Sequence, residues 1–244
     1  MSRTNPNADR VPNPAECVFE WKGGDGGHLQ YYDKDKKENV DVKTPFSFIV
    51  LDQLATIGGY NKKLKTGLYA NEVRDTRAER LVVKYFAGDK VAEGFYADIK
   101  DTVVAKSGHF VAKVYIAFKD GDGLKIGAIR FQGCSLGPWF EFTKANSKAI
   151  YEQGITIAKG ALNEEGQIPF TPCVFALKPV SPETDTAAGK LQEELKEYLK
   201  VYFSRNVAAK TEQPEQASAG DELPENPPEE QQAEQPTDSD DVPF

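Results

Sequence analysis

Aromatic and basic residues alternate between positions 60 and 80 of the chain, and this combination favours binding to an unpaired nucleic-acid strand. Aromatic rings stack on exposed bases, while lysine and arginine side chains pair with phosphates. The segment follows Gly58-Gly59, which predicts a mobile loop, and residues 60–69 carry cations without matching acids. We therefore expect contacts with single-stranded DNA from Tyr60, Lys62, Lys63, Lys65, Tyr69, Arg74, Arg77 and Arg80.

A second set of candidates lies along the strands expected between residues 80 and 131. Cations and aromatic residues alternate there as well, and such aromatic residues fit either base stacking or core packing. The cations of this stretch are Lys84, Lys113, Lys125 and Arg130. We predict DNA contacts from Lys84, Lys113 and Tyr115, and from Trp139, which follows a proline in an expected loop.

No arrangement of residues indicates catalysis or a bound metal. His28 and His109 are the two histidines and the cysteines form no close pair, so a zinc site is not expected. Residues 120–123 (Asp-Gly-Asp-Gly) lack the further ligands of a calcium loop and predict a hairpin turn. The sequence also shows no nucleophile beside a base, so we expect a non-enzymatic protein without cofactor.

Two alternatives stay open. Carboxylates stand next to basic residues at Glu72, Asp75, Asp98 and Asp101, as in a metal-dependent nuclease, although surface ion pairs explain the same pattern. The second alternative is a viral structural or protein-binding β-sandwich without DNA affinity.

The end of the chain differs in composition from the rest. Residues 211–244 contain eleven acidic residues, repeated Pro and Gln, and no Lys or Arg. The whole chain has 30 basic and 38 acidic residues, so residues 1–210 hold 30 basic against 27 acidic and are net +3. This division predicts a mildly basic folded body that meets an anion and a disordered acidic tail over residues 207–244.

The last residues combine acids with a terminal Pro-Phe. Pro243 keeps the chain extended, and the ring of Phe244 can fill an apolar pocket while its carboxylate pairs with an arginine. We expect a partner-binding tip made of Asp238, Asp240, Asp241, Val242, Pro243 and Phe244.

This tip resembles the C-terminal peptide of bacterial and bacteriophage single-stranded DNA-binding proteins, in which several aspartates precede an aliphatic residue and Pro-Phe. Ser239 interrupts the acids here, and Val242 replaces a larger aliphatic residue. The body is unlike that of the bacterial housekeeping protein, which favours the bacteriophage type. The resemblance implies an OB-fold body that coats single-stranded DNA in replication, recombination or repair. It also implies a tip that recruits helicase, polymerase or nuclease partners.

The elements that must position these residues are short and mostly extended. Apolar runs bounded by turn residues predict a mainly β body, an OB-fold-like barrel or a sandwich. The runs span residues 17–21, 28–32, 46–57, 80–86, 110–118, 124–131, 155–158 and 174–177. A helix is predicted over 182–205, since Ser181-Pro182 is a helix start and Leu191, Leu195 and Leu199 recur at helical spacing.

These elements give a flexible N-terminal segment over residues 1–14, a DNA-binding domain over 15–206 and the tail over 207–244. Scattered Cys17, Cys134 and Cys173 indicate a reducing compartment, and no apolar run has membrane-spanning length. Residues 1–14 are polar and unlike a signal peptide. We therefore expect a cytoplasmic protein (in the host cytoplasm if it is phage-encoded) with no membrane partner; the sequence leaves self-association open.

Overall fold

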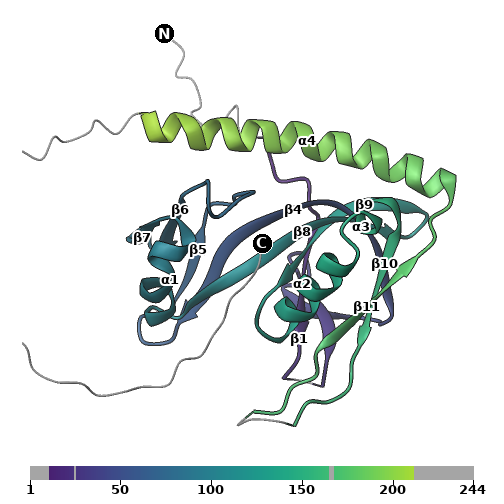
Figure 1. Cartoon of the computed structure of the whole chain (residues 1–244), viewed down its shortest axis with the longest axis horizontal. Helices are drawn as coiled ribbons and strands as arrows, with labels where there is room; N and C mark the ends of the chain where they lie inside the picture. Colours follow the sequence, from purple (N-terminus) through teal and green to yellow (C-terminus); the bar gives the residue numbers. More distant parts are fainter. Residues whose placement is uncertain (1–10, 25, 165–167, 212–244) are drawn as a thin grey trace, which may run out of the picture. The chain divides into compact units, whose positions relative to one another are not determined.

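The structure, a computed structural model, describes residues 11–24, 26–164 and 168–211 (Figure 1). Residues up to Arg205 form one compact unit, here called the body, and a second unit begins at Asn206. Of this second unit the structure describes the helical backbone to Thr211.

Within the described residues, eleven strands form one sheet. Its main path runs β3-β2-β1-β9-β8-β4-β5-β6-β7, and β10 pairs with both β4 and β11. β1 and β9 are parallel, and the other neighbours are antiparallel. The prediction of a mainly β body with a C-terminal helix is confirmed. The strands are β1 (Cys17–Lys22), β2 (His28–Asp33), β3 (Glu38–Val42), β4 (Phe46–Asn61), β5 (Thr66–Ala70), β6 (Leu81–Tyr85), β7 (Lys90–Gly94), β8 (Gly108–Asp120), β9 (Gly123–Phe131), β10 (Gly154–Lys159) and β11 (Cys173–Lys178).

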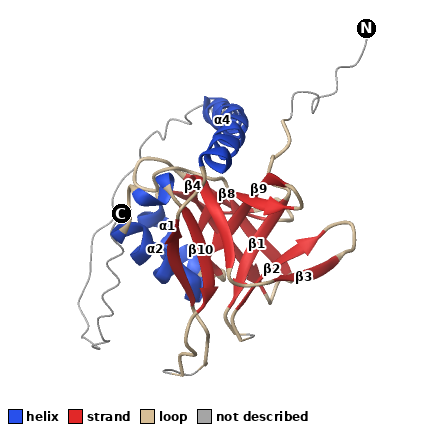
Figure 2. Cartoon of the chain, turned by 90° about the vertical axis from the view of Figure 1, so that its right-hand side faces the viewer, coloured by secondary structure: helices blue, strands red, loops and turns tan. Residues whose placement is uncertain are grey.

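The strands β4, β8 and β9 are apolar on both faces, because each face is covered by a different layer. One face carries the larger core, which includes Val114, Ile116 and Ile129 and is closed by helix α2 (Leu136–Ala145). The other face carries Tyr115, Ala117 and Ala128 and is covered by the long helix α4 (Pro182–Thr211). Figure 2 shows α4 on one side of the sheet and α1 and α2 on another.

Helix α4 begins where the sequence predicts it. The Ser181 Oγ accepts a hydrogen bond from the Thr184 backbone N–H at 3.3 Å, as expected at a helix N-terminus. Leu195 and Leu199 are buried against the sheet, and Gln192 Nε2 donates to the Leu51 carbonyl at 3.0 Å. The predicted helix is therefore confirmed, and its backbone continues to Thr211.

Strand β4 is long enough to serve two parts of the body. Its first half pairs with β10 and β8, and a bulge between Val50 and Asp52 shifts the register with β8. Its last residues, 58–61, pair with β5, which continues the sheet into β6 and β7. We call this part, residues 58–70 and 81–94, the arm; helix α1 (Tyr96–Ala105) buries Ile99 and Val103 in the core that the arm shares. Figure 1 shows β5, β6 and β7 together with α1 at one end of the body.

Three helices lie where the sequence analysis expected none, namely α1, α2 and the short α3 (Ala149–Glu152). A 3-10 turn over Gly133–Ser135 leads into α2. Among the described residues, no helix combines the length and the apolar character that crossing a membrane requires.

Candidate nucleic-acid interface

The outer face of the arm is built by the alternation of its strands. Leu68 of β5 and Val83 of β6 point inward and are 3% and 0% exposed. Their neighbours Tyr69 and Lys84 therefore point outward, and the two lie directly opposite each other. Tyr60 of β4 lies opposite Gly67 of β5 on the same face. The pleat thus gathers side chains from three strands on one surface.

Three aromatic side chains are exposed on this surface. Tyr60 is 56% exposed, Tyr69 is 42% exposed and Phe86 is 73% exposed. The Phe86 backbone N–H donates to the Gly67 carbonyl at 3.0 Å, and the Phe86 ring covers Gly67, where a Cβ would lie 2.6 Å from its Cε2. The rings of Tyr69 and Phe86 have centroids 5.5 Å apart. Exposed adjacent rings of this kind offer faces on which bases can stack.

The segment expected to be a mobile loop is instead a tight hairpin, so that expectation is wrong. Strand β4 continues through Gly58-Gly59 to Asn61, whose Oδ1 accepts hydrogen bonds from the backbone N–H groups of Lys63 and Leu64, both at 3.1 Å. The two glycines serve close approach: a Cβ at Gly59 would collide with the Ser107 carbonyl. Lys65 closes the turn in the left-handed region, with a φ of 50°.

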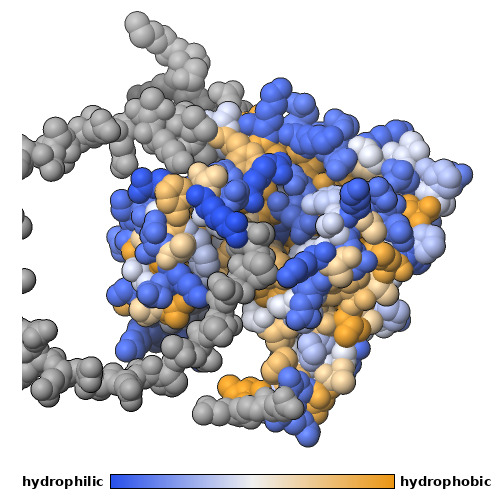
Figure 3. Space-filling model, viewed as in Figure 1, coloured by the Kyte–Doolittle hydropathy of each residue, from blue (hydrophilic) through white to orange (hydrophobic). Residues whose placement is uncertain are grey.

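Cations surround the aromatic side chains of the arm. Lys62, Lys63 and Lys65 are exposed at the hairpin turn, and Lys84 is half-buried between the strands. Within the part of the chain that the structure describes, none of these four forms an ion pair at 4.0 Å or less. Figure 3 shows apolar residues interspersed with strongly hydrophilic ones on this end of the body. The arm therefore carries exposed rings together with lysines that have no ion-pair partner among the described residues.

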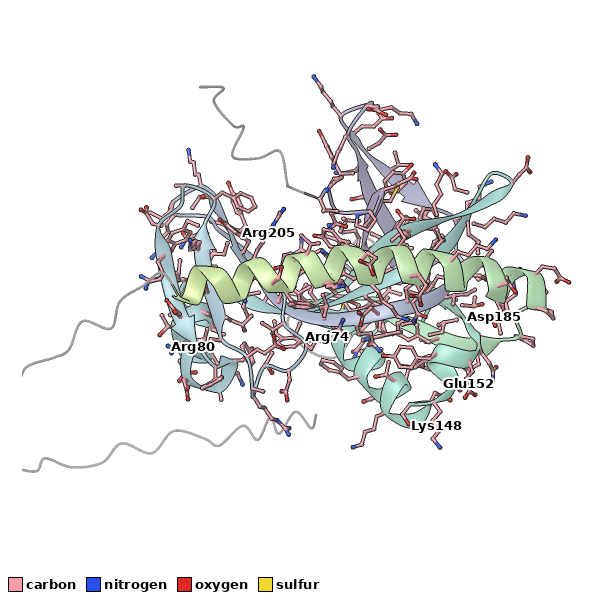
Figure 4. The ribbon with its side chains drawn as sticks, turned by 90° about the horizontal axis from the view of Figure 1, so that it is seen from above. Arg74, Arg80, Lys148, Glu152, Asp185 and Arg205 are labelled. Carbon is pink, nitrogen blue, oxygen red and sulfur yellow. The ribbon has the colours of Figure 1, made fainter. Side chains whose placement is uncertain are left out.

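The three predicted arginines have different surroundings. Arg74 donates to both carboxylate oxygens of Asp52, at 2.8 and 2.7 Å, and its guanidinium lies 5.3 Å from the ring centroid of Phe203 in α4. Figure 4, which views α4 from above, shows Arg74 beside this helix and Arg80 at the arm end of the body. Arg77 and Arg80 are exposed. All three arginines are thus exposed, and Arg74 is in addition fixed by its contacts with Asp52 and Phe203 although its side chain is 51% exposed.

Lys113 and Tyr115 were predicted to contact DNA, and the structure places both below the surface. Lys113 is 9% exposed and Tyr115 is 0% exposed, because α4 covers this face of β8. The Lys113 ammonium pairs with the Glu72 carboxylate and donates to the Tyr115 hydroxyl at 3.0 Å, which donates to Glu72 Oε2 at 3.0 Å. Burial and the Glu72 carboxylate raise the pKa of Tyr115. The prediction of surface contacts from these two residues is corrected.

Trp139 was expected in an exposed loop, and this expectation is also wrong. It lies in α2 and is 0% exposed. Its ring stacks on Phe131 at a centroid distance of 4.5 Å, and its indole N–H donates to Gln53 Oε1 at 3.1 Å. A fully packed ring with a satisfied N–H has no free face for a base.

Other expectations concern charged segments. The turn predicted at residues 120–123 is confirmed, since it joins β8 to β9 with Asp120 opposite Gly123. Lys125 pairs with Glu16 at 2.7 Å and with Asp120 at 2.9 Å.

Of the carboxylates considered for a nuclease, Glu72 belongs to the buried network, and Asp98 and Asp101 are exposed on α1. Among the described residues no three His, Cys, Asp or Glu side chains lie close enough together to hold a metal ion.

Sequence reasoning missed Phe86, the most exposed ring of the arm. The signal was present: Leu81 and Val83 are apolar at every second position, which places residue 86 on the outer face just before the Ala87-Gly88 turn. Lys90, opposite Lys84 on β7, was missed as well, and it pairs with Glu93 at 3.1 Å. The predicted tip residues 238–244 lie outside the described residues.

In comparisons with family models, with curated proteins and with solved structures, no match to this chain was found.

Proposed function

We propose that this chain binds single-stranded DNA through the outer face of the arm. The observation that carries the proposal is the exposure of Tyr60, Tyr69 and Phe86 on one surface, next to lysines that form no ion pair with any of the described residues. Large exposed rings are costly in water unless a ligand covers them, and bases cover them by stacking. The basic groups add attraction for phosphates that does not depend on sequence.

The surface fits a single strand better than a duplex. The bases of a duplex already stack on one another, so flat rings on a protein can use their faces only when bases are unpaired. The site therefore accepts most sequences and discriminates by strandedness.

A titration tests this proposal directly. A fluorescent oligo-dT of about 16 nucleotides should bind the full chain more tightly than a duplex of equal length. The logarithm of its affinity should fall linearly with the logarithm of salt concentration, by about 0.7 for each phosphate contact. Equal affinity for duplex and single strand would rule out the arm as a stacking surface.

The proposal extends to the tail. The acidic residues and the terminal Pro-Phe support recruitment of replication or repair proteins, as the resemblance implies, with the body holding the DNA. Removal of residues 212–244 keeps the whole of α4 and should leave the melting temperature and DNA binding in place while partner binding is lost. Removal of Phe244 alone should reproduce the loss of partner binding, because ring and carboxylate act at one pocket.

We also propose that the sheet is a divergent OB-like barrel. Its support is the bulge after Val50 of β4, because a bulge bends a strand and helps a sheet to curve, and the larger core on one face of β4, β8 and β9. The proposed binding of DNA depends on the residues of the arm and does not require the sheet to be a barrel.

The nuclease alternative is separated by one assay. Labelled single-stranded DNA incubated with the protein and Mg²⁺ or Mn²⁺ should remain intact and migrate as a retarded complex. Degradation that is lost on replacement of Asp98 and Asp101 by Asn would favour the nuclease instead.

A further inference from the structure

The outer face of the arm is continuous with one face of the central sheet. Lys84 lies opposite Tyr69, Tyr69 lies opposite Gly58, and Gly58 lies opposite His109 of β8. Residues that are directly opposite in antiparallel strands project to the same face. Gly58 is thus the position at which the aromatic surface of the arm meets the surface of the body.

The space above Gly58 is filled by the guanidinium of Arg130. A Cβ at Gly58 would collide with Arg130 Nη2, so the absence of a side chain is what admits the guanidinium. Adjacent strands are about 4.8 Å apart, so this group lies about one strand spacing from the row of Tyr69. Arg130 belongs to β9, and its side chain reaches this place across β8.

The position of Arg130 is fixed by an acid on β1. Its Nη1 donates to Glu20 Oε1 at 3.1 Å, and Lys22 binds the same carboxylate at 2.8 Å. Burial alone would raise the pKa of Glu20, but the hydrogen bond from Lys22 and the charge of Arg130 outweigh it, and the pKa is lowered. One ionised acid is therefore shared by two cations, and this cluster keeps a net positive charge.

The guanidinium keeps donors for a ligand. Its side chain is 30% exposed, and Nη1 is the nitrogen that donates to Glu20. Among the described residues no buried side-chain nitrogen lacks a partner, so an Arg130 N–H group without a protein acceptor is accessible to solvent. A guanidinium that is held through one nitrogen and is partly exposed can bind a phosphate, for which its planar set of donors is suited.

We infer that Arg130 binds a phosphate of the DNA strand whose bases stack on Tyr69 and Phe86, with Glu20 and Gly58 as the residues that position it. The inference rests on the function proposed above. It adds a contact from the body to a surface made by the arm, so that the strand is held where the two meet.

Arg130→Gln is the first test, measured as affinity for oligo-dT over a range of salt. It should weaken binding roughly tenfold at moderate salt and lower the log–log salt slope by about 0.7. Lys125→Gln is the control, because Lys125 is also a cation of β9 paired with acids, Glu16 and Asp120, but lies at the other end of the strand, opposite Phe118 of β8. It should change affinity and slope much less.

Gly58→Ala is the second test, since it keeps every charge and displaces the guanidinium. It should weaken binding several-fold while the melting temperature stays close to that of the unchanged chain. If Arg130→Gln were to unfold the body, Gly58→Ala would still test whether the Arg130 guanidinium contributes to DNA binding.

An abasic oligonucleotide distinguishes a phosphate contact from stacking on a base. On this probe Tyr69→Ala should have no further effect, whereas Arg130→Gln should still weaken binding. If Tyr69→Ala weakens binding to oligo-dT but Arg130→Gln and Gly58→Ala do not, the inference fails and the proposed function stands. If the unchanged chain does not bind oligo-dT, both fail.

Discussion

Two regions of this molecule are rich in aromatic residues, and they use them in opposite ways. Around Trp139 the rings of Phe131, Phe142 and Phe175 lie within 4.5–6.2 Å of the indole, and Trp139 and Phe131 have no exposed surface. On the arm, Tyr60, Tyr69 and Phe86 are also neighbours but remain 42–73% exposed. Aromatic content alone therefore does not distinguish a core from a binding surface.

The difference lies in the covering layer. The face of the sheet near Trp139 is closed by α2, and the opposite face of β8 and β9 is closed by α4. On the arm, α1 packs on the inner side, beside Leu68 and Val83, and in the described residues no element covers the outer side. A ring remains available for a ligand where a strand has one covered face rather than two.

The largest expected effect is that of Trp139→Ala on folding. It should lower the free energy of unfolding by about 3–5 kcal/mol, since it opens a cavity and leaves Gln53 without its donor. Urea denaturation measures this loss. Tyr151→Ala is the control, because Tyr151 is 50% exposed on the neighbouring α3 and should cost much less. A Trp139→Ala protein of normal stability and reduced DNA affinity would reverse the comparison between the two regions.

Phe86→Ala should act on DNA binding instead of on folding. A base that stacks on this ring contributes about 1–3 kcal/mol, so affinity for oligo-dT should fall by about 5- to 150-fold. The melting temperature should change little, because the ring is 73% exposed. Ile168→Ala removes an apolar side chain of similar exposure, 76%, outside the arm, and should leave affinity unchanged. Equal losses of affinity from both variants would show that removal of any exposed apolar side chain weakens binding, and that the arm is not the binding surface.

The lysines of the arm turn have a close structural counterpart in the β2–β3 turn. In each turn an Asn or Asp accepts two backbone hydrogen bonds and a lysine ends the turn in the left-handed region, Lys65 with φ 50° and Lys37 with φ 58°. Replacing Lys62 and Lys63 by Gln and Lys65 by Asn keeps this geometry, since Asn tolerates that region. The log–log salt slope should fall by up to about 2.

The corresponding triple substitution in the β2–β3 turn, at Lys34, Lys36 and Lys37, lowers the net charge of the chain equally. It should change the slope much less, because Asp33 and Asp35 already stand beside these lysines. Equal changes in slope from the two triple variants would indicate a general charge effect and remove the arm turn from the site.

Gly67→Ala is expected to have the smallest effect and is the most specific test of the arm. A Cβ at this position would lie 2.6 Å from the Phe86 ring, so the ring must shift while every aromatic residue remains. Affinity for oligo-dT should fall a few-fold. Gly137→Ala, at a position with open space, is the control. An unchanged affinity for Gly67→Ala would mean that the present position of the Phe86 ring is not the one that DNA uses.

The sequence predicts the elements of this fold better than it predicts what covers them. Alternation and turn residues located β1, β2, β8 and β9, and the spacing of leucines located α4. The run at residues 46–57 was identified as a strand, but Gly58-Gly59 concealed its continuation, because close packing requires glycine there as a loop would. Helix α2 was missed since Gly137-Pro138 favours a loop locally, whereas the core that buries Trp139 is assembled from distant segments.

The same reason explains the outcome for individual site residues. Tyr60 and Tyr69 were predicted to be exposed, and they are. Tyr115 and Lys113 occupy a strand with the same mixture of ring and cation, and only the position of α4, some 80 residues away in sequence, decides that they are buried. A pattern within one strand cannot report which helix will lie on it.

The buried network beneath α4 also determines how that helix is aligned. The leucines at positions 191, 195 and 199 form an apolar ridge, and such a ridge alone would tolerate sliding by one helical turn, about 5.4 Å. The Tyr202 hydroxyl accepts a hydrogen bond from the Glu72 backbone N–H at 2.7 Å, directly beside the Glu72 pair with Lys113. A slipped helix would take Tyr202 away from this group and disturb the cover of a buried charge pair, which is costly. The leucines thus stabilise the packing of α4 on the sheet, and the polar contacts at Glu72 select one position of the helix along its axis.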